Sequence, residues 1–153
     1  MYISDIVFDK NKKVNVSRET LILRPPIIAV GIGCNRNTPK EEIEKLFFKT
    51  LKNFTLSEKS VFTLASINLK DDEIGLLEFA KEQNIKIKFF KKDELNKVEN
   101  IKTPSIVAKK YTGARSVCEA AAILAADKGN LIVSKQISGN VTLAIARKKI
   151  YYT

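Results

Sequence analysis

The stretch IIAVGIGCNRNTP, residues 27–39, joins an apolar run to a polar loop and then to the start of a helix. The run IIAVGIG is typical of a buried strand. Thr38, Pro39, Lys40 and Glu41 then predict a capping box with proline at the first helical position. In an open α/β sheet, the loop after such a strand is a usual place for a ligand. The glycines suit a sharp turn equally well, so this stretch alone leaves both interpretations open.

The spacing of apolar residues extends this pattern of a strand followed by a helix. The first helix is expected to bury one face, made of Ile43, Leu46, Phe47, Thr50, Leu51 and Phe54. A second strand is predicted at 61–67 and a third at 85–90, where the lysines alternate outward. The helix between them has Asp71 or Asp72 as its cap, and its apolar residues include Ile74, Leu77 and Ala80.

The last third of the chain predicts an alanine-rich helix and a hairpin. A second capping box, residues 116–119, begins the helix, and Gly129 ends it. The segments 130–137 and 141–152 are joined by Ser138-Gly139-Asn140, which favours a hairpin turn. We therefore expect an α/β fold, with a mixed β-sheet sandwiched by helices and ending in a C-terminal β-hairpin. Residues 1–26 are expected to form an extended lead-in, possibly the tail of a preceding region, and 27–153 the α/β domain.

Composition narrows the classes of function. The chain has 153 residues with a net charge of +10, no histidine and two cysteines. Without histidine, the usual triad and most zinc sites are excluded. The positive field attracts anions, so both nucleic acid and a small polycarboxylate are candidate partners, and a solvated lysine-rich surface is the alternative. No signal peptide or membrane-spanning stretch is evident, which makes the cytoplasm the expected compartment.

Several polar residues near the predicted strand ends are candidate ligands. Gly31 and Gly33 would allow a ligand close to the backbone, and Arg36 is suited to binding a carboxylate. The dinucleotide fingerprint fails because Arg36 occupies the third glycine position. Cys34 is either a thiolate nucleophile or a small buried thiol. Thr38 is either a ligand or only the helix cap.

A second set of candidates follows the later strands. Ser66 and Lys70 come directly after the second strand, where Lys70 is a candidate cation or a solvated lysine. Ser105 belongs to a TPS sequence that would equally suit a helix start. Lys135 lies in an otherwise apolar strand, either as an inward cation or exposed at an edge. Glu119 is mainly a capping acid, with an acid–base role as the alternative.

Together these segments resemble one family. The sequences VGIGCNRNT, LASINLKDDEIGLLEFA, TPS, TGARSVCEAAAILAA and LIVSKQISGNVTLAIAR occur in this order in the C-terminal domain of the cobalamin-biosynthesis G proteins (CbiG) and in the stand-alone protein CobE. The resemblance covers residues 27 to 147. The family often has a basic residue directly after the cysteine, but this chain has Asn35 there and Arg36 one position later. This difference weakens any claim that a cation at one fixed position binds the substrate.

The resemblance implies a role in cobalamin (corrin ring) biosynthesis. CbiG proteins are cobalt-precorrin-5A hydrolases, which open the δ-lactone of the macrocycle and release a two-carbon fragment as acetaldehyde. The implied partner is an anionic corrin precursor that brings its own cobalt, with no separate cofactor and no metal site. Other cobalamin-pathway enzymes, or an N-terminal CbiG region, are further possible partners, whereas a membrane partner is not expected.

The resemblance and the residue chemistry together define the expected site. Thr38, Ser66, Lys70, Glu73, Ser105, Glu119 and Lys135 fall on recurring positions of the family, as do Gly31, Gly33 and Cys34. Glu73 or Glu119 is the candidate base for lactone opening, provided that burial raises its pKa. The alternatives are a non-catalytic corrinoid-binding module of the CobE type and, more remotely, a basic nucleic-acid-binding domain.

Overall fold

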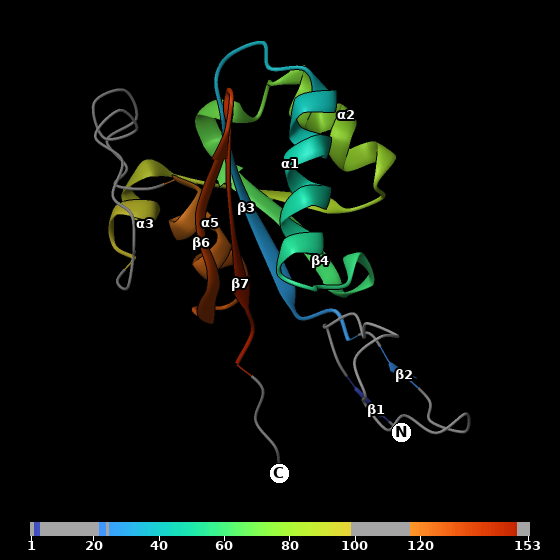
Figure 1. Cartoon of the computed structure of the whole chain (residues 1–153). Coiled ribbons are helices and arrows are strands. Elements are labelled where there is room, and N and C mark those ends of the chain that lie inside the picture. Colours follow the sequence, from blue (N-terminus) through green and yellow to red (C-terminus); the bar gives the residue numbers. More distant parts are fainter. Residues whose placement is uncertain (1, 4–21, 24, 99–116, 150–153) are drawn as a thin grey trace.

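The computed structural model describes residues 2–3, 22–23, 25–98 and 117–149. In this part of the chain, a five-stranded sheet lies between two layers of helices (Figure 1). The elements of the sandwich are β3 (Ile28–Cys34), α1 (Lys40–Asn53), β4 (Val61–Ile67), α2 (Ile74–Glu82), β5 (Lys86–Phe90), α3 (Lys92–Asn96), α5 (Val117–Ala125), β6 (Asn130–Ser138) and β7 (Val141–Arg147). The short 3₁₀ turns η1 (Glu58–Ser60) and η2 (Asn68–Lys70) come before and after β4.

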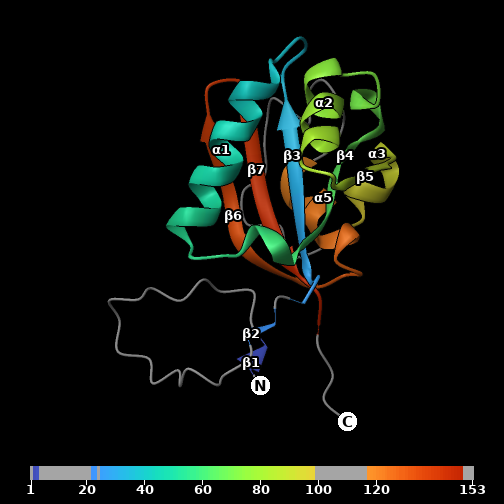
Figure 2. The same ribbon diagram turned by 90° about the vertical axis from the view of Figure 1, so that its right-hand side faces the viewer.

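The sheet is mixed, as predicted, with strand order β5-β4-β3-β7-β6. Strands β5, β4 and β3 are parallel, whereas β7 is antiparallel to β3 and β6 is antiparallel to β7. The predicted hairpin is confirmed: Gly139, with φ of 56°, and Asn140 form the turn between β6 and β7. A separate pair of parallel strands, β1 (Tyr2–Ile3) and β2 (Ile22–Leu23), lies below the five-stranded sheet in Figure 2, near the start of β3.

Alternation of large and small residues in β3 decides which helices cover each face. Ile28, Val30 and Ile32 belong to the core under α1 and α2, together with Phe47 and Phe79. Figure 2 shows these two helices on one side of the sheet and α5 on the other. Because successive side chains of a strand point to opposite faces, the small residues of β3 face α5, and Ala29 packs in that second core with the helix's alanines.

The helix boundaries correct three of the sequence predictions. No capping box starts α1, because its N-cap is Pro39 and the Thr38 hydroxyl donates to the Asn35 carbonyl instead. The N-cap of α2 is Glu73 rather than Asp71 or Asp72. The sequence analysis assigned no helix or strand directly after the strand 85–90, but Lys92–Asn96 form the short helix α3.

Only one of the three apolar residues named for this helix, Ala80, is buried in α2. Ile74 and Leu77 are exposed, whereas Leu76, Phe79 and Ala80 are buried. Gly75 explains this rotation, since a Cβ there would lie 2.1 Å from the Thr38 carbonyl oxygen. The Gly75 side of the helix therefore packs against the start of α1, and Ile74 turns outward.

The predicted core face of α1 is confirmed except at its last residue. Ile43, Leu46, Phe47, Thr50 and Leu51 are buried, but Phe54 is exposed at the C-cap. The alanine-rich helix is confirmed as α5, although it ends at Ala125, before Gly129. Ser116, which was expected to cap it, lies outside the described residues.

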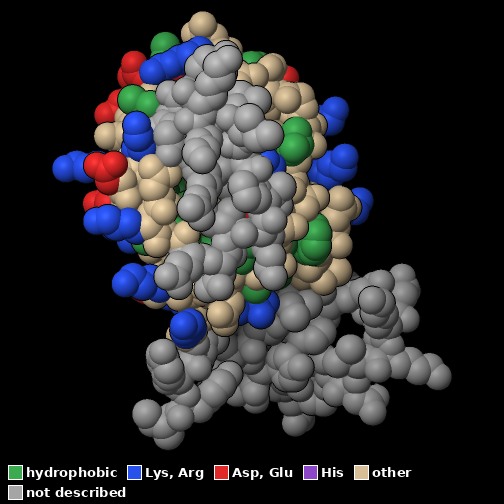
Figure 3. Space-filling view, turned by 90° about the vertical axis from the view of Figure 1, so that its left-hand side faces the viewer, with side chains coloured by type: hydrophobic (Ala, Val, Ile, Leu, Met, Phe, Trp, Pro, Cys, Tyr) green, Lys and Arg blue, Asp and Glu red, His purple; other side chains and the backbone are tan. Residues whose placement is uncertain are grey.

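Basic side chains border the face of the molecule that Figure 3 shows. On the side of the molecule that carries α5, Figure 3 shows Lys and Arg side chains around both margins rather than in one patch. The edge strand β5 carries two exposed lysines, Lys86 and Lys88. Lysines on an edge strand oppose pairing with another chain. No described helix is long and apolar enough to cross a membrane.

Candidate functional site

The carboxyl ends of β3 and β4 meet at one end of the sheet, where α1 and α2 begin (Figure 1). The loop after β3 carries Arg36, and the turn after β4 carries Lys70, Asp72 and Glu73. The parallel pairing of β3 with β4 therefore brings these two loops together at one end of the sheet.

Arg36 joins the two loops through three hydrogen bonds. Its Nη1 donates to Asp72 Oδ1 at 2.6 Å and to Glu73 Oε1 at 2.9 Å, and its Nη2 donates to the Leu69 carbonyl at 2.7 Å. These contacts lower the pKa of Asp72, chiefly through the hydrogen bond from Arg36. Arg36 was predicted to hold a substrate carboxylate, but in this structure its charge faces two carboxylates of its own chain.

Glu73 is the buried member of this cluster. Its side chain is 5% exposed, against 54% for Arg36. Its second oxygen, Oε2, accepts a hydrogen bond from the Asn37 backbone N–H at 3.1 Å. Asn37 has φ of 62°, a left-handed conformation that asparagine tolerates better than most residues. Both oxygens of the candidate base thus hold the loop after β3.

Lys70 is the cation at this edge that has no ion pair with a described carboxylate. Its side chain is half-buried, and its charge acts on Cys34 and Asp72. Burial raises the pKa of the Cys34 thiol to about 11, and nearby Lys70 opposes that rise only in part. A thiol with that pKa is protonated near neutrality, which favours the buried thiol over the nucleophile as the interpretation of Cys34.

Two hydroxyl groups that were candidate ligands are used inside the fold. Ser66 is fully buried and donates to the Ile32 carbonyl at 2.6 Å. Thr38 is 4% exposed and donates to the Asn35 carbonyl at 2.7 Å. Ser66 therefore ties β4 to β3, and Thr38 shapes the loop. Thr38 still lines the surface hollow described below.

Gly31 and Gly33 correct the prediction most clearly. A Cβ on Gly31 would lie 1.8 Å from the Cys118 carbonyl oxygen of α5, and one on Gly33 would lie 2.6 Å from Thr142 Oγ1. Gly31 is buried as well. Gly31 therefore lets β3 pack closely against α5 and does not form a floor for a ligand, whereas half-buried Gly33 faces Thr142 of the paired strand β7.

Glu119 and Lys135 lie together on the α5 side of the sheet, away from Arg36. Glu119 is fully buried, and its Oε2 accepts a hydrogen bond from the Lys135 backbone N–H at 3.0 Å. The pairing of β6 with β7 shifts between Val133 and Gln136, so Lys135 lies in a bulge. The carboxylate satisfies an amide that the irregular ladder leaves free. Ser105 lies outside the described residues.

A hollow of about 410 Å³ opens beside the Arg36 cluster. It is lined by residues 36–41 at the start of α1 and by residues 72–75 and Glu78 at the start of α2. Lys40 on its rim pairs with Glu82. The hollow is large enough for a carboxylate arm or a small ligand. Among the described residues, no three Cys, Asp or Glu side chains converge to hold a metal ion.

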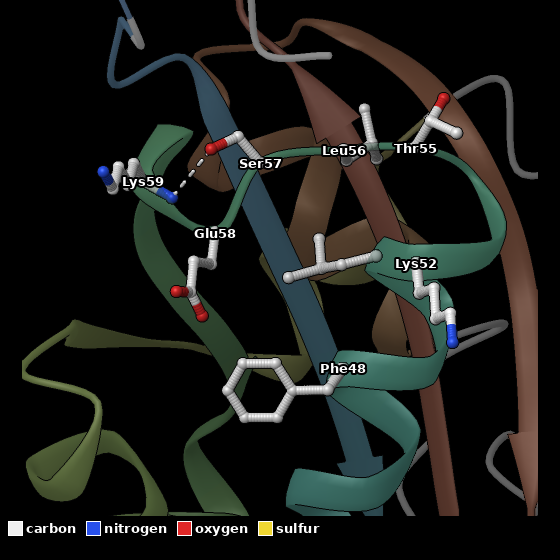
Figure 4. Close-up of a pocket in the computed structure, with 8 residues that line it drawn as sticks. Phe48, Lys52, Thr55, Leu56, Ser57, Glu58 and Lys59 are labelled. Carbon is white, nitrogen blue, oxygen red and sulfur yellow. Dashed lines mark hydrogen bonds between the residues drawn. The ribbon is translucent and has the colours of Figure 1, made fainter. Parts of the chain in front are cut away.

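A second hollow lies near the other end of α1. It measures about 510 Å³ and is lined by Phe48, Leu51, Lys52 and residues 55–59 (Figure 4). The one hydrogen bond drawn there runs from the Lys59 backbone N–H to Ser57 Oγ, at 3.3 Å. Because this hollow lies away from the carboxyl ends of the parallel strands, the hollow beside Arg36 is the better candidate site.

The sequence did not single out three of the groups that build this site. Asp72, the Leu69 carbonyl and the Asn37 backbone N–H all contact the Arg36–Glu73 pair. Backbone groups leave no signal in a sequence. The run Asp71-Asp72-Glu73 did carry one, because three acids opposite a lone arginine suggest an ion pair.

Comparisons with known proteins agree on one family. Residues 28–146 match the family model described as "Cobalamin synthesis G C-terminus". A cobalt-precorrin-5A hydrolase from Priestia megaterium is 40% identical over 137 residues, which cover 90% of this chain and 36% of that protein. Protein CobE from Sinorhizobium sp is 29% identical over 121 residues, covering 78% of this chain and 79% of CobE.

The solved structures give the same result. A crystal structure of CobE, described as a protein from the cobalamin (vitamin B12) biosynthetic pathway, superposes with a TM-score of 0.76 and 32% identity. It covers 82% of this chain and 93% of CobE. This chain spans little more than a third of the length of the hydrolase from Priestia megaterium and most of the length of CobE.

Proposed function

Because the chain belongs to the family of cobalamin synthesis G C-terminal domains, we propose that it binds the corrin substrate of a cobalt-precorrin-5A hydrolase. The reaction opens the δ-lactone of the macrocycle and releases a two-carbon fragment as acetaldehyde. The substrate is a large polyanion that carries its own cobalt. The domain acts in the cytoplasm, where the reducing conditions suit its two buried cysteines.

The observation that carries this proposal is the position of Lys70. It lies at the carboxyl end of β4 next to Cys34, with no carboxylate of the described chain paired to it. Arg36, in contrast, is already paired with Asp72 and Glu73. Lys70 is therefore the cation at this edge that remains to meet an acetate or propionate arm. The hollow of about 410 Å³ accommodates an arm, and its lining on the α2 side begins two residues after Lys70, at Asp72.

This chain's part in the reaction is to bind and orient the substrate. The two candidate bases are already used: Glu73 holds Arg36 and the Asn37 amide, and Glu119 holds the Lys135 amide. A base must reach the water that attacks the lactone. We assign that base to another part of the hydrolase, since the relative from Priestia megaterium is much longer than this chain.

Anaerobic incubation with cobalt-precorrin-5A tests the proposal. The chain alone should shift the visible spectrum of the corrinoid as it binds, without releasing acetaldehyde. Adding the remaining part of a hydrolase as a separate polypeptide should then yield acetaldehyde. Acetaldehyde from this chain alone would refute the assignment of the base, and an unchanged corrinoid spectrum would refute binding. Binding that never leads to turnover would instead favour a CobE-type module.

A further inference from the structure

Exposed apolar side chains cluster beside the hollow. Of the five large apolar side chains that are exposed in the described chain, three lie within residues 69–77. These are Leu69, Ile74 and Leu77, with exposed fractions of 48%, 71% and 38%. Ile74 is the first residue of α2 and also lines the hollow. Leu77 follows one turn later, on the same side of the helix.

The packing of α2 holds this apolar side outward. Gly75 lies against the Thr38 carbonyl, and Leu76 and Phe79 are buried in the core. Turning Ile74 inward would require giving up those contacts. The folded domain therefore presents an isoleucine and a leucine to solvent at the edge of the hollow.

A tetrapyrrole is too large for the hollow beside this apolar surface. A volume of about 410 Å³ takes an arm of the corrin, but the macrocycle with its other arms must stay outside. Ile74, which is part of the rim, is the apolar side chain that such a ring would meet first. A ring with apolar faces and anionic arms needs an apolar surface next to cations.

Resting on the proposed function, we infer that one face of the corrin ring lies on Ile74 and Leu77 while an arm enters the hollow. In the chain, Lys70 precedes this apolar surface beside exposed Asp71, and exposed Lys81 follows it one turn after Leu77, so these two lysines are the cations available to the other arms. Asp72 and Glu78 also border it; Asp72 is paired with Arg36. The apolar side of α2 thus selects a flat macrocycle over a simple polycarboxylate.

Binding of cobyrinic acid, a corrin with free carboxylate arms, tests this assignment. The variant with both Ile74→Ser and Leu77→Ser should bind it about tenfold more weakly than the unaltered chain, a loss of about 1.4 kcal/mol. Ile137→Ser is the matched control, because Ile137 is 66% exposed on β6, the edge strand at the other side of the sheet from β5, which α2 contacts. Titration followed by corrin absorbance gives each Kd, and unchanged melting temperatures verify that the variants fold.

The outcomes separate this inference from the proposed function. If the unaltered chain binds cobyrinic acid and the double variant binds it equally well, the apolar surface has no role and the inference falls, while the proposed function stands. If the unaltered chain does not bind, both fall. Equal weakening by Ile137→Ser would indicate unspecific adsorption and also overturn the inference. Support requires that the defect be confined to α2 and persist at high salt, where contacts between arms and lysines are screened.

Discussion

Replacing Glu73 by glutamine tests whether its carboxylate has a structural role or acts as a catalytic base. In the structure, Glu73 Oε1 accepts from Arg36 at 2.9 Å and Oε2 accepts from the Asn37 N–H at 3.1 Å. Glutamine keeps one acceptor oxygen and presents an NH₂ group in place of the other. One of the two donors therefore loses its partner at a buried position. We expect Glu73→Gln to destabilise the fold.

The expected loss is about 1–3 kcal/mol. A hydrogen bond to a charged group contributes about 1.5–3 kcal/mol, and half-exposed Arg36 recovers part of it from water and from Asp72. In a domain of this size, each kcal/mol lowers the melting temperature by about 2–4 °C. Asp72→Asn is the matched control, because Asp72 bonds the same Nη1 but is 69% exposed. A surface ion pair contributes at most about 1 kcal/mol.

Thermal and urea unfolding, followed by circular dichroism, measure both variants under the same conditions. The reasoning is refuted if Glu73→Gln and Asp72→Asn lower stability by the same amount. It is refuted equally if Glu73→Gln leaves stability unchanged but abolishes turnover in a reconstituted hydrolase. That second result would restore Glu73 as the base.

Three further predictions concern binding, packing and ionisation. Lys70→Gln should weaken corrinoid binding about two- to tenfold at low salt and less at high salt, with Lys59→Gln at the opposite hollow as an unaffected control in the same titration. Gly33→Ala should cost about 1–3 kcal/mol in urea unfolding, and adding Thr142→Ala should recover part of that loss, because the new Cβ would lie 2.6 Å from Thr142 Oγ1; equal stability of the single and double variants would contradict this. Folding raises the pKa of Cys34 from 9.0 to about 11, so the thiol ionises more easily in the unfolded chain, and the free energy of unfolding should fall between pH 9 and pH 11. At pH 8, iodoacetamide should therefore modify Cys34 far more slowly in the folded protein than in the unfolded protein, and mass spectrometry of the Cys34 peptide measures both rates.

The sequence predicted the positions of the helices and strands better than it predicted which of their side chains are buried. Periodicity located β3, β4, β5 and the hairpin, because strands and long amphipathic helices repeat a pattern over many residues. It misplaced the buried side of α2, since the contact of Gly75 with the Thr38 carbonyl joins two segments far apart in the chain. It missed α3, which has only five residues and one buried side chain, Leu95.

For the candidate site, the sequence placed the loops of Arg36 and Lys70 at the ends of their strands but did not identify the partners of Arg36. The loops that carry Arg36 and Lys70 do meet at the carboxyl ends of β3 and β4. Arg36 was expected to be free for a substrate, yet Asp72 and Glu73 bind it at 2.6 and 2.9 Å. Which of several nearby carboxylates meets an arginine depends on the turn geometry of residues 68–73, and local spacing does not specify that geometry.

Alternation along β3 explains why the predicted single site divides into two. Residues next to each other in a strand point to opposite faces, so Gly31 meets α5 whereas Cys34 joins the core under α1 and α2. Glu119 and Lys135 lie with Gly31 on the α5 side, whereas Glu73 and Lys70 lie beside Cys34. A corrin held at the start of α2 would therefore lie on the side of Lys70 and Glu73, whereas Glu119 holds the Lys135 amide on the α5 side of the sheet.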